Sequence, residues 1–563
     1  MNSRLLLGLF TLLFLAQCGK QQEKSPTSRS VLQELNLKRG NVTLCGAPAL
    51  QFGRAELQTS CSETTREQFN LALTLLHSFE YDEAEKAFSA VIDSTPNCAM
   101  AYWGVAMANF HPLWTPPTED ELRKGTRAVQ VAKSLNTTTR EAAYIEAIAA
   151  FYNNWETTSH STRCLKFEQA MEAVYTAFPS DKEAAVFYAL ALTAAALPTD
   201  KSFTKQKKAG RILQALYPGQ PNHPGIVHYL IHTYDYPELA ALGLPAARKY
   251  AAIAPSSAHA LHMPSHIFTR LGLWDECIKS NLASVSSAKC YAEATNMPGH
   301  WDEELHGLDY LTYAYLQKGA NDSAQIQRDY VKSIKEVQPV TFKVAYAYAA
   351  IPARYALETR QWAAAANLPV APSSFPWHKF PWQEAIVHYA RLLGAARIKS
   401  LPNARVELAQ LHRLQNMLLA QHDAYKANQV AIQLTSGEAW LRWAEGNNTA
   451  AVALMQRAAD MEDQTEKHPV TPCEVLPARE LLGDMLLQLH QPHEALVAYR
   501  ANLRKHPNRF NALYGAGLAA KKLGDTQAAA FYFQQLLRVV GASNSPRPEV
   551  AASQQYVQAV AAL

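Results

Sequence analysis

The chain has 563 residues, of which 48% are hydrophobic, so it is long enough and apolar enough to bury a large core. Its 53 Lys and Arg residues nearly balance 49 Asp and Glu residues, and the formal net charge of +4 argues against nucleic acid as a partner. Only 23 glycines stand among many alanines, leucines, glutamines and glutamates, a composition that favours helix over sheet.

Residues 1–18 have the pattern of an export signal. Arg4 precedes an apolar run over residues 5–16 that is too short for a stable transmembrane helix. Leu15-Ala16-Gln17-Cys18 resembles the lipobox of bacterial lipoproteins, although Gln17 departs from the small residue that this family prefers. The resemblance implies a signal peptide over 1–18 and lipidation of Cys18 as the new N-terminus.

This signal predicts a location in the bacterial cell envelope, as an outer-membrane lipoprotein facing the periplasm. The lipid on Cys18 would then be the chain's only attachment to the membrane. Ordinary secretion into the periplasm is the alternative, and a cytoplasmic protein with a chance apolar start is the third possibility. Residues 19–62 are expected to form a polar tether and an N-terminal segment.

The cysteines beyond Cys18 are odd in number, because the chain has 8 in all. An exported protein can form disulfides, and an odd count leaves at least one free thiol. Cys45 with Cys61, and Cys277 with Cys290, are the closest pairs in sequence. The sequence leaves the actual pairing open.

Small residues, aromatic residues and prolines recur along the body at the spacing of a helical hairpin. Small residues let two helices approach closely, aromatics fill the gap to the next hairpin, and proline ends the second helix. The pattern resembles the tetratricopeptide repeat (TPR) at Ala84, Phe88 and Pro96, at Gly483, Ala495, Tyr499 and Pro507, and again at Gly515, Ala529 and Phe533. The resemblance implies an all-α, TPR-like α-solenoid: a right-handed superhelix of about ten or eleven hairpins.

The period of this repeat is broken at residues 292–304 and 369–380. We therefore expect N-terminal and central repeats over 63–368, a rigid loop rich in proline and aromatic residues over 369–381, and C-terminal repeats over 382–563. TPR proteins usually bind a protein or peptide along their concave surface. That is the partner which the resemblance implies for this chain.

Two histidine pairs are the best indication of function. His228 and His232 lie four residues apart, and His262 and His266 repeat that spacing after about 34 residues, the period of a TPR. Residues four apart share one face of a helix, where two imidazoles can bind one metal ion. Two successive repeats therefore carry a histidine pair on the same face.

The repeat register extends this face over four first helices: two that start near Pro224 and near Ala258, one that carries His306, and one that carries Arg354. Their side chains are expected to line one wall of the concave groove. The predicted metal ligands are His228, His232, His259, His262, His266, His306 and Asp309, and the predicted ligand-binding residues are His223, Tyr313, Tyr346 and Arg354. Asp235 is an alternative ligand or outer partner. Pro264 either kinks its helix or starts it, which would leave His259 and His262 on a loop.

Imidazole ligands suit a transition metal, here zinc, copper or iron. A narrower version groups His223, His228 and His232 against His259, His262 and His266, because two histidine triplets on helices are typical of binuclear copper sites. Metal-free recognition of a ligand, and purely structural histidines, are the alternatives.

The sequence thus predicts an exported TPR scaffold that binds a metal ion or a metal-bound ligand through its histidines, and a protein or peptide along the solenoid. One alternative is a metal-dependent hydrolase or oxidase that uses the same histidines, and another is a pure interaction scaffold of the cell envelope. Segments 98–104, 222–232, 262–268 and 477–483 resemble a group of bacterial TPR-containing (lipo)proteins with no established activity. No phosphate-binding loop, GxSxG or HExxH motif decides whether the chain is an enzyme.

Overall fold

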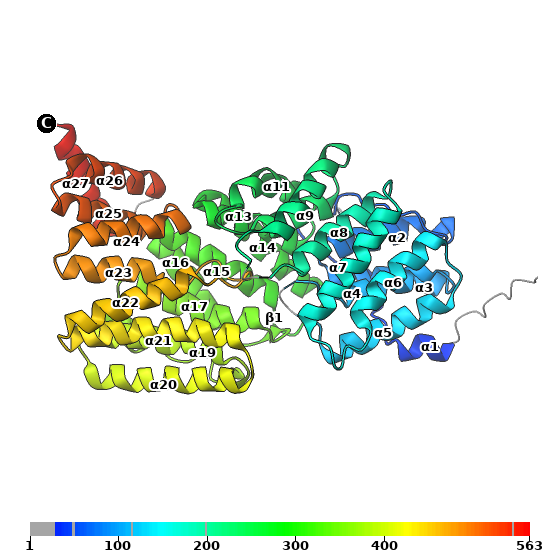
Figure 1. The fold of residues 1–563 in the computed structure, drawn as a ribbon, viewed down its shortest axis with the longest axis horizontal. Helices are drawn as coiled ribbons and strands as arrows, with labels where there is room; N and C mark the ends of the chain where they lie inside the picture. The colour runs from blue at the N-terminus through cyan, green and yellow to red at the C-terminus, as the bar shows by residue number, and fades with distance from the viewer. Residues whose placement is uncertain (1–28, 48–50, 114–115, 198–199, 543–544, 563) are drawn as a thin grey trace, which may run out of the picture.

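A computed structural model describes residues 29–47, 51–113, 116–197, 200–542 and 545–562. Over these residues the chain is all-α and TPR-like, as predicted, and consecutive helices pack as antiparallel hairpins (Figure 1). One short parallel pairing joins β1 (His300–Trp301) to β2 (Val337–Gln338).

The N-terminal hairpins follow the short helix α1 (Arg29–Glu34) and the turn η1 (Glu63–Thr65). They pair α2 (Arg66–His77) with α3 (Tyr81–Ser94), α4 (Ala99–Ala108) with α5 (Glu119–Ser134), α6 (Thr139–Tyr152) with α7 (His160–Ala177), and α8 (Lys182–Ala194) with α9 (Thr204–Leu216), which ends in the turn η2 (Tyr217–Gly219).

The central hairpins carry the predicted site. They pair α10 (Pro224–Tyr234) with α11 (Ala240–Ile253), α12 (Ala258–His262) and α13 (Pro264–Leu271) with α14 (Trp274–Ala294), α15 (Asp302–Gln317) with α16 (Asn321–Ser333), and α17 (Phe342–Glu358) with α18 (Trp362–Ala366).

The C-terminal hairpins complete the stack. They pair α19 (Pro381–Arg397) with α20 (Leu401–Ala420), α21 (Ala424–Ala444) with α22 (Asn448–Asp463), α23 (Ala478–Gln488) with α24 (Pro492–Lys505), and α25 (Phe510–Lys522) with α26 (Thr526–Val540), before the closing helix α27 (Pro548–Ala561). The predicted proline and aromatic loop falls between α18 and α19 and contains the turn η3 (Trp377–Lys379). The division of the chain into separate parts around that loop stays a prediction.

The residues of the repeat pattern make the contacts that the pattern predicts. The ring of Tyr499, on α24, lies against Gly483 of its own hairpin and Gly515 of the next, so closely that a Cβ at Gly515 would come within 2.3 Å of the ring. Phe88 lies against Gly104 in the same way near the other end of the chain. Small residues and aromatics thus set how closely neighbouring hairpins approach.

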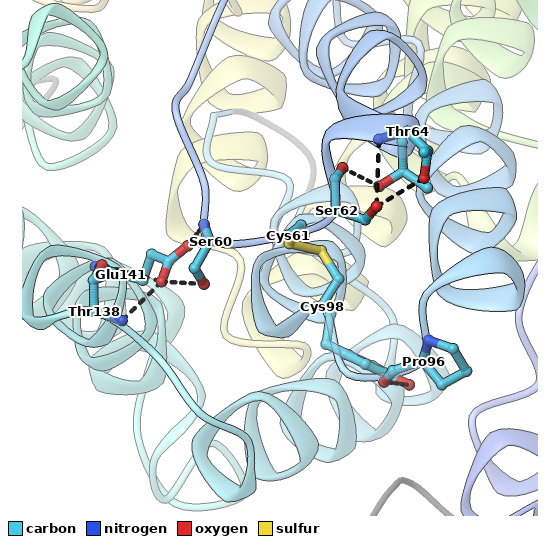
Figure 2. Close-up of a disulfide and its surroundings, with 10 residues drawn as sticks. Ser60, Cys61, Ser62, Thr64, Pro96, Cys98, Thr138 and Glu141 are labelled. Atoms are coloured by element: carbon cyan, nitrogen blue, oxygen red, sulfur yellow. Dashed lines mark hydrogen bonds between the residues drawn. A yellow bond between two sulfur atoms is a disulfide. The ribbon is translucent and has the colours of Figure 1, made fainter.

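The N-terminal segment is bound across the helices. Its backbone N–H groups donate hydrogen bonds from Gln51 to Ser256 Oγ at 2.9 Å and from Arg54 to the Asn222 carbonyl oxygen at 2.9 Å. Figure 2 shows the last part of this segment, where the Ser60 N–H and hydroxyl both donate to the Glu141 carboxylate. The described part of the predicted 19–62 segment is therefore largely a strap rather than a free tether.

Two disulfides fix that strap, and neither joins the cysteines that are closest in sequence. Cys45 bonds to Cys290 on α14, and Cys61 bonds to Cys98 at the start of α4 (Figure 2). The strap's path across distant helices decides the partners, with Cα–Cα distances of 5.8 and 4.9 Å. Among the described residues, three buried cysteines remain free: Cys164, Cys277 and Cys473.

These disulfides fit an oxidising location outside the cytoplasm. Within the described ranges, we find no helix that combines the length and the apolarity needed to cross a membrane. The predicted signal peptide and Cys18 lie outside the described residues.

Gly515→Ala should destabilise the C-terminal hairpins, because the new methyl group would clash with the buried Tyr499 ring. Overpacking of this kind typically costs about 1–3 kcal/mol, which thermal unfolding can measure as a lower melting temperature. Gly219→Ala is the matched control, since nothing lies within 4 Å of its would-be Cβ. Equal melting temperatures for the two variants would contradict this account of the packing.

Candidate metal centre

The six predicted histidine ligands meet at one place, on the first helices of three successive hairpins. α10 begins at Pro224, as predicted, with Nδ1 of His223 capping it by accepting from the Ile226 N–H at 3.3 Å. α15 carries His306, again as predicted.

Between these helices, Pro264 kinks the chain. α12 ends at His262 and α13 begins at Pro264, but the Met263 N–H still donates to the His259 carbonyl at 2.9 Å. His259 and His262 are therefore helical, and the alternative that places them on a loop is wrong. The kink lies between His262 and His266. Both rings nevertheless remain in the cluster.

His228, His232 and His259 form the first triad. Nε2 of His228 lies 2.9 Å from Nε2 of His232 and 3.1 Å from Nε2 of His259. The three nitrogens lie within 4.8 Å of one another, so they could hold one metal ion.

His262, His266 and His306 form the second triad. Nε2 of His262 lies 3.1 Å from Nε2 of His266, and the His262 and His306 ring centroids are 4.2 Å apart. Their ligand atoms also lie within 4.8 Å of one another. The two triads adjoin, since the ring centroids of His232 and His266 are 6.3 Å apart.

This grouping corrects the predicted triplets. His259 leaves the second pair and joins the first, because α12 places it over α10, whereas His306 comes from the next hairpin to complete the second triad. The capping residue His223 belongs to neither triad.

Hydrogen bonds fix which nitrogen faces the centre in three of the six rings. Nδ1 of His228 donates to the His77 carbonyl oxygen at 2.7 Å, and Nδ1 of His266 donates to Asp235 Oδ2 at 3.0 Å. Nδ1 of His262 donates to Asn281 Oδ1 at 2.7 Å, an orientation set by the Asn281 amide N–H donating to the Cys277 carbonyl at 2.8 Å. In each neutral ring, Nε2 therefore presents a lone pair.

The rings are buried rather than spread along an open groove, which corrects the expected exposure of this wall. His228, His262 and His266 are 0, 1 and 3% exposed, and His259 is the least buried of the six. Burial lowers the pKa of all six imidazoles, and it lowers that of His259 to about 3 with Lys343 nearby. All six rings are therefore neutral near pH 7, the form that binds metals.

Asp235 is the outer partner of the second triad, one of the two roles considered for it from the sequence. Besides His266, it binds the Arg270 guanidinium at 2.8 Å and Lys467 Nζ at 3.4 Å. Burial alone would raise the pKa of its carboxyl, but Lys467 and Arg270 hold that pKa well below its usual range. Asp235 thus remains an anion that accepts the His266 N–H.

The other predicted residues lie apart from the triads. Asp309 forms a buried ion pair with Arg354, and Arg354 also donates to the Cys473 carbonyl oxygen at 3.1 Å. The Tyr346 hydroxyl donates to the same oxygen at 3.3 Å, and the Tyr313 hydroxyl accepts from Arg509 at 3.2 Å. These contacts are all within the chain, and a ligand-binding role for Tyr313, Tyr346 and Arg354 stays a prediction.

Segment 464–477, between α22 and α23, is the part of this region that sequence reasoning missed. It brings Lys467 to Asp235, and the Cys473 carbonyl to Arg354 and Tyr346. The segment therefore contacts residues that the repeat register assigned to the wall of the groove. Its irregular sequence has no period that could have signalled this contact.

His223 belongs to a separate cluster with His77 and Glu183. Its Nε2 donates to Glu183 Oε1 at 2.7 Å, since its Nδ1 is occupied as an acceptor in the α10 cap, and His77 Nε2 lies 2.8 Å from Glu183 Oε2. These three groups also have the spacing of metal ligands. However, Nε2 of His223 already carries the proton that it donates to Glu183, so it has no lone pair for a metal ion. The two all-histidine triads are therefore the stronger candidates.

Comparisons with known proteins bear on the repeats alone. Residues 510–539 match the family model named Tetratricopeptide repeat. This segment contains Gly515, Ala529 and Phe533, which the sequence pattern assigned to such a repeat. No curated protein matches the chain.

Solved structures similar to the chain include the human IFIT1 dimer with m7Gppp-AAAA, at 12% identity and a TM-score of 0.34, covering 86% of this chain and 92% of that one. The human IFIT1 dimer with PPP-AAAA has 11% identity, a TM-score of 0.33 and the same coverage.

The metal-free protein should lose stability as the pH falls below about 6.5. The unfolded His259 binds a proton near that pH, whereas the folded ring does so only near pH 3, so the free energy of unfolding falls by up to about 1.4 kcal/mol per pH unit from this residue. Denaturant unfolding from pH 7 to 5 should show a shallower decline for His259→Ala. His412→Ala, at an exposed position on α20, should match the wild type, and an unchanged decline in His259→Ala would contradict the prediction.

Proposed function

We propose that this protein is an exported scaffold that binds two transition-metal ions, one in each histidine triad. The ligands are His228, His232 and His259 in the first site, and His262, His266 and His306 in the second. Asp309 is left out of this set because its carboxylate pairs with Arg354.

The observation that carries the proposal is the approach of His262 and His266. Both rings donate through Nδ1 to groups that can only accept, so their Nε2 lone pairs face each other at 3.1 Å. A buried acceptor without a donor costs about 1–3 kcal/mol, and here two such acceptors oppose each other. A cation between them removes this cost.

In the first triad, the crowding of nitrogens around His228 favours a cation. Nε2 of His228 has one lone pair but faces two imidazole nitrogens, those of His232 and His259. The lone pair of His228 can accept one good hydrogen bond, from only one of these two rings. A metal ion, in contrast, can bind a lone pair from each of the three rings.

Outer partners support the same role. Metal-binding histidines usually donate their second N–H to a carboxylate, a carbonyl or a similar acceptor, which orients the ring and raises its basicity. His266 has the Asp235 carboxylate, His228 a backbone carbonyl and His262 an amide carbonyl. Zinc, copper and iron all accept such ligands.

Export and attachment through a lipid on Cys18, as in bacterial TPR lipoproteins, form part of this proposal. The two disulfides support an oxidising compartment. We further propose a protein or peptide partner along the exposed surface of the hairpins, by analogy with TPR proteins. Exclusion of nucleic acid rests only on the balanced charge.

Metal analysis of protein purified without a histidine tag tests the proposal. We expect two ions per chain after loading and dialysis, and one ion in His228→Gln and in His262→Gln, because each change removes a ligand from one triad only. His412→Gln controls for the loss of a histidine and should keep both ions. Fewer than one tightly bound ion per wild-type chain, with no thermal shift on adding metal, would show that a shared proton rather than a metal joins the rings.

A further inference from the structure

The two triads adjoin so closely that their ions would act as a pair. Resting on the proposed function, we infer that both sites take copper(I), and that the pair binds dioxygen as a bridging peroxide. The inference depends on three features of the centre: the contact between the triads, the charge of the ligand set, and the coordination position that three ligands leave open.

The contact runs through His232 and His266. Their ring centroids are 6.3 Å apart, and each ring belongs to a different triad. One helix also links the two triads, because α12 contributes His259 to the first and His262 to the second. Two ions held by these rings would therefore be neighbours rather than occupants of independent sites.

The charge of the ligand set favours monovalent ions. All six ligands are neutral imidazoles, and the adjacent carboxylate of Asp235 is already balanced by Arg270 and Lys467. Two divalent ions would bury four positive charges with no ligand anion to offset them, whereas two copper(I) ions bury half as many. Imidazole is a suitable ligand for copper, and among the metals that it suits copper has a stable monovalent state.

Three protein ligands leave a position open on each ion, as in catalytic metal sites. Dioxygen is small and uncharged, so burial of the centre does not exclude it. Each copper(I) gives up one electron, and dioxygen takes up both. The product is two copper(II) ions and one peroxide dianion: the O–O bond order falls from two to one, the bond is not cleaved, and no proton is consumed.

The peroxide also resolves the electrostatic problem of the oxidised centre. Its two negative charges offset half of the charge on the two copper(II) ions, in a place where the chain itself supplies no ligand anion. The ligand set therefore suits copper(I) alone, or copper(II) together with a bridging anion.

The test loads metal-free protein with two equivalents of copper(I) without oxygen and then admits dioxygen. We expect two copper ions per chain, an intense near-ultraviolet absorption band from peroxide bound to copper(II), and little or no paramagnetic resonance signal because the paired spins couple. Removing dioxygen under vacuum should reverse the band.

Variants separate this inference from the proposed function. His228→Gln should retain one copper ion, lose the band and show, after oxidation, the full resonance signal of an isolated copper(II). His412→Gln, exposed on α20, should behave as wild type. Two bound copper ions with a full resonance signal for each would overturn the paired centre and leave metal binding intact, as would binding of zinc without retention of copper(I). No binding of any metal would overturn the proposed function itself.

Discussion

The centre depends on hydrogen bonds that anchor imidazole Nδ1 atoms on the side away from the metal positions. The His77 carbonyl, the Asn281 amide and the Asp235 carboxylate each accept one N–H, from His228, His262 and His266. Each bond turns a ring so that its Nε2 lone pair points inward. Because these buried lone pairs face other imidazole nitrogens, the cluster gains most from a cation.

The hairpin stack supplies this geometry from distant parts of the chain. α10, α12, α13 and α15 bring the rings together, and the last residue of α2, His77, supplies its carbonyl oxygen. Segment 464–477 reaches the same centre from the C-terminal repeats and provides Lys467. The disulfide between Cys45 and Cys290 ties the N-terminal strap to α14, the helix that carries Asn281. The helices carry the histidines, and contacts between distant parts of the chain fix their orientation.

The sequence was sufficient to predict the elements that obey a local period. The TPR spacing predicted the hairpins, and HxxxH predicted that His228 and His232, and His262 and His266, would share faces. It could not predict which rings would join in each triad, because that depends on the kink at Pro264 and on the approach of His259 on α12 to His228 on α10. The sequence also did not predict the contacts of segment 464–477 or the roles of Asn281 and the His77 carbonyl, because no periodic signal marks an irregular segment or a backbone acceptor. The disulfide partners depend on the strap's path in the same way.

The most direct measurement of the central claim is anomalous X-ray diffraction from crystals of the metal-loaded protein. The account predicts two peaks per chain, one about 2.0 Å from Nε2 of His228, His232 and His259, and the other at the same distance from Nε2 of His262, His266 and His306. Density for metal bound through Nδ1, or no peak between the rings in crystals soaked with copper or zinc, would contradict it.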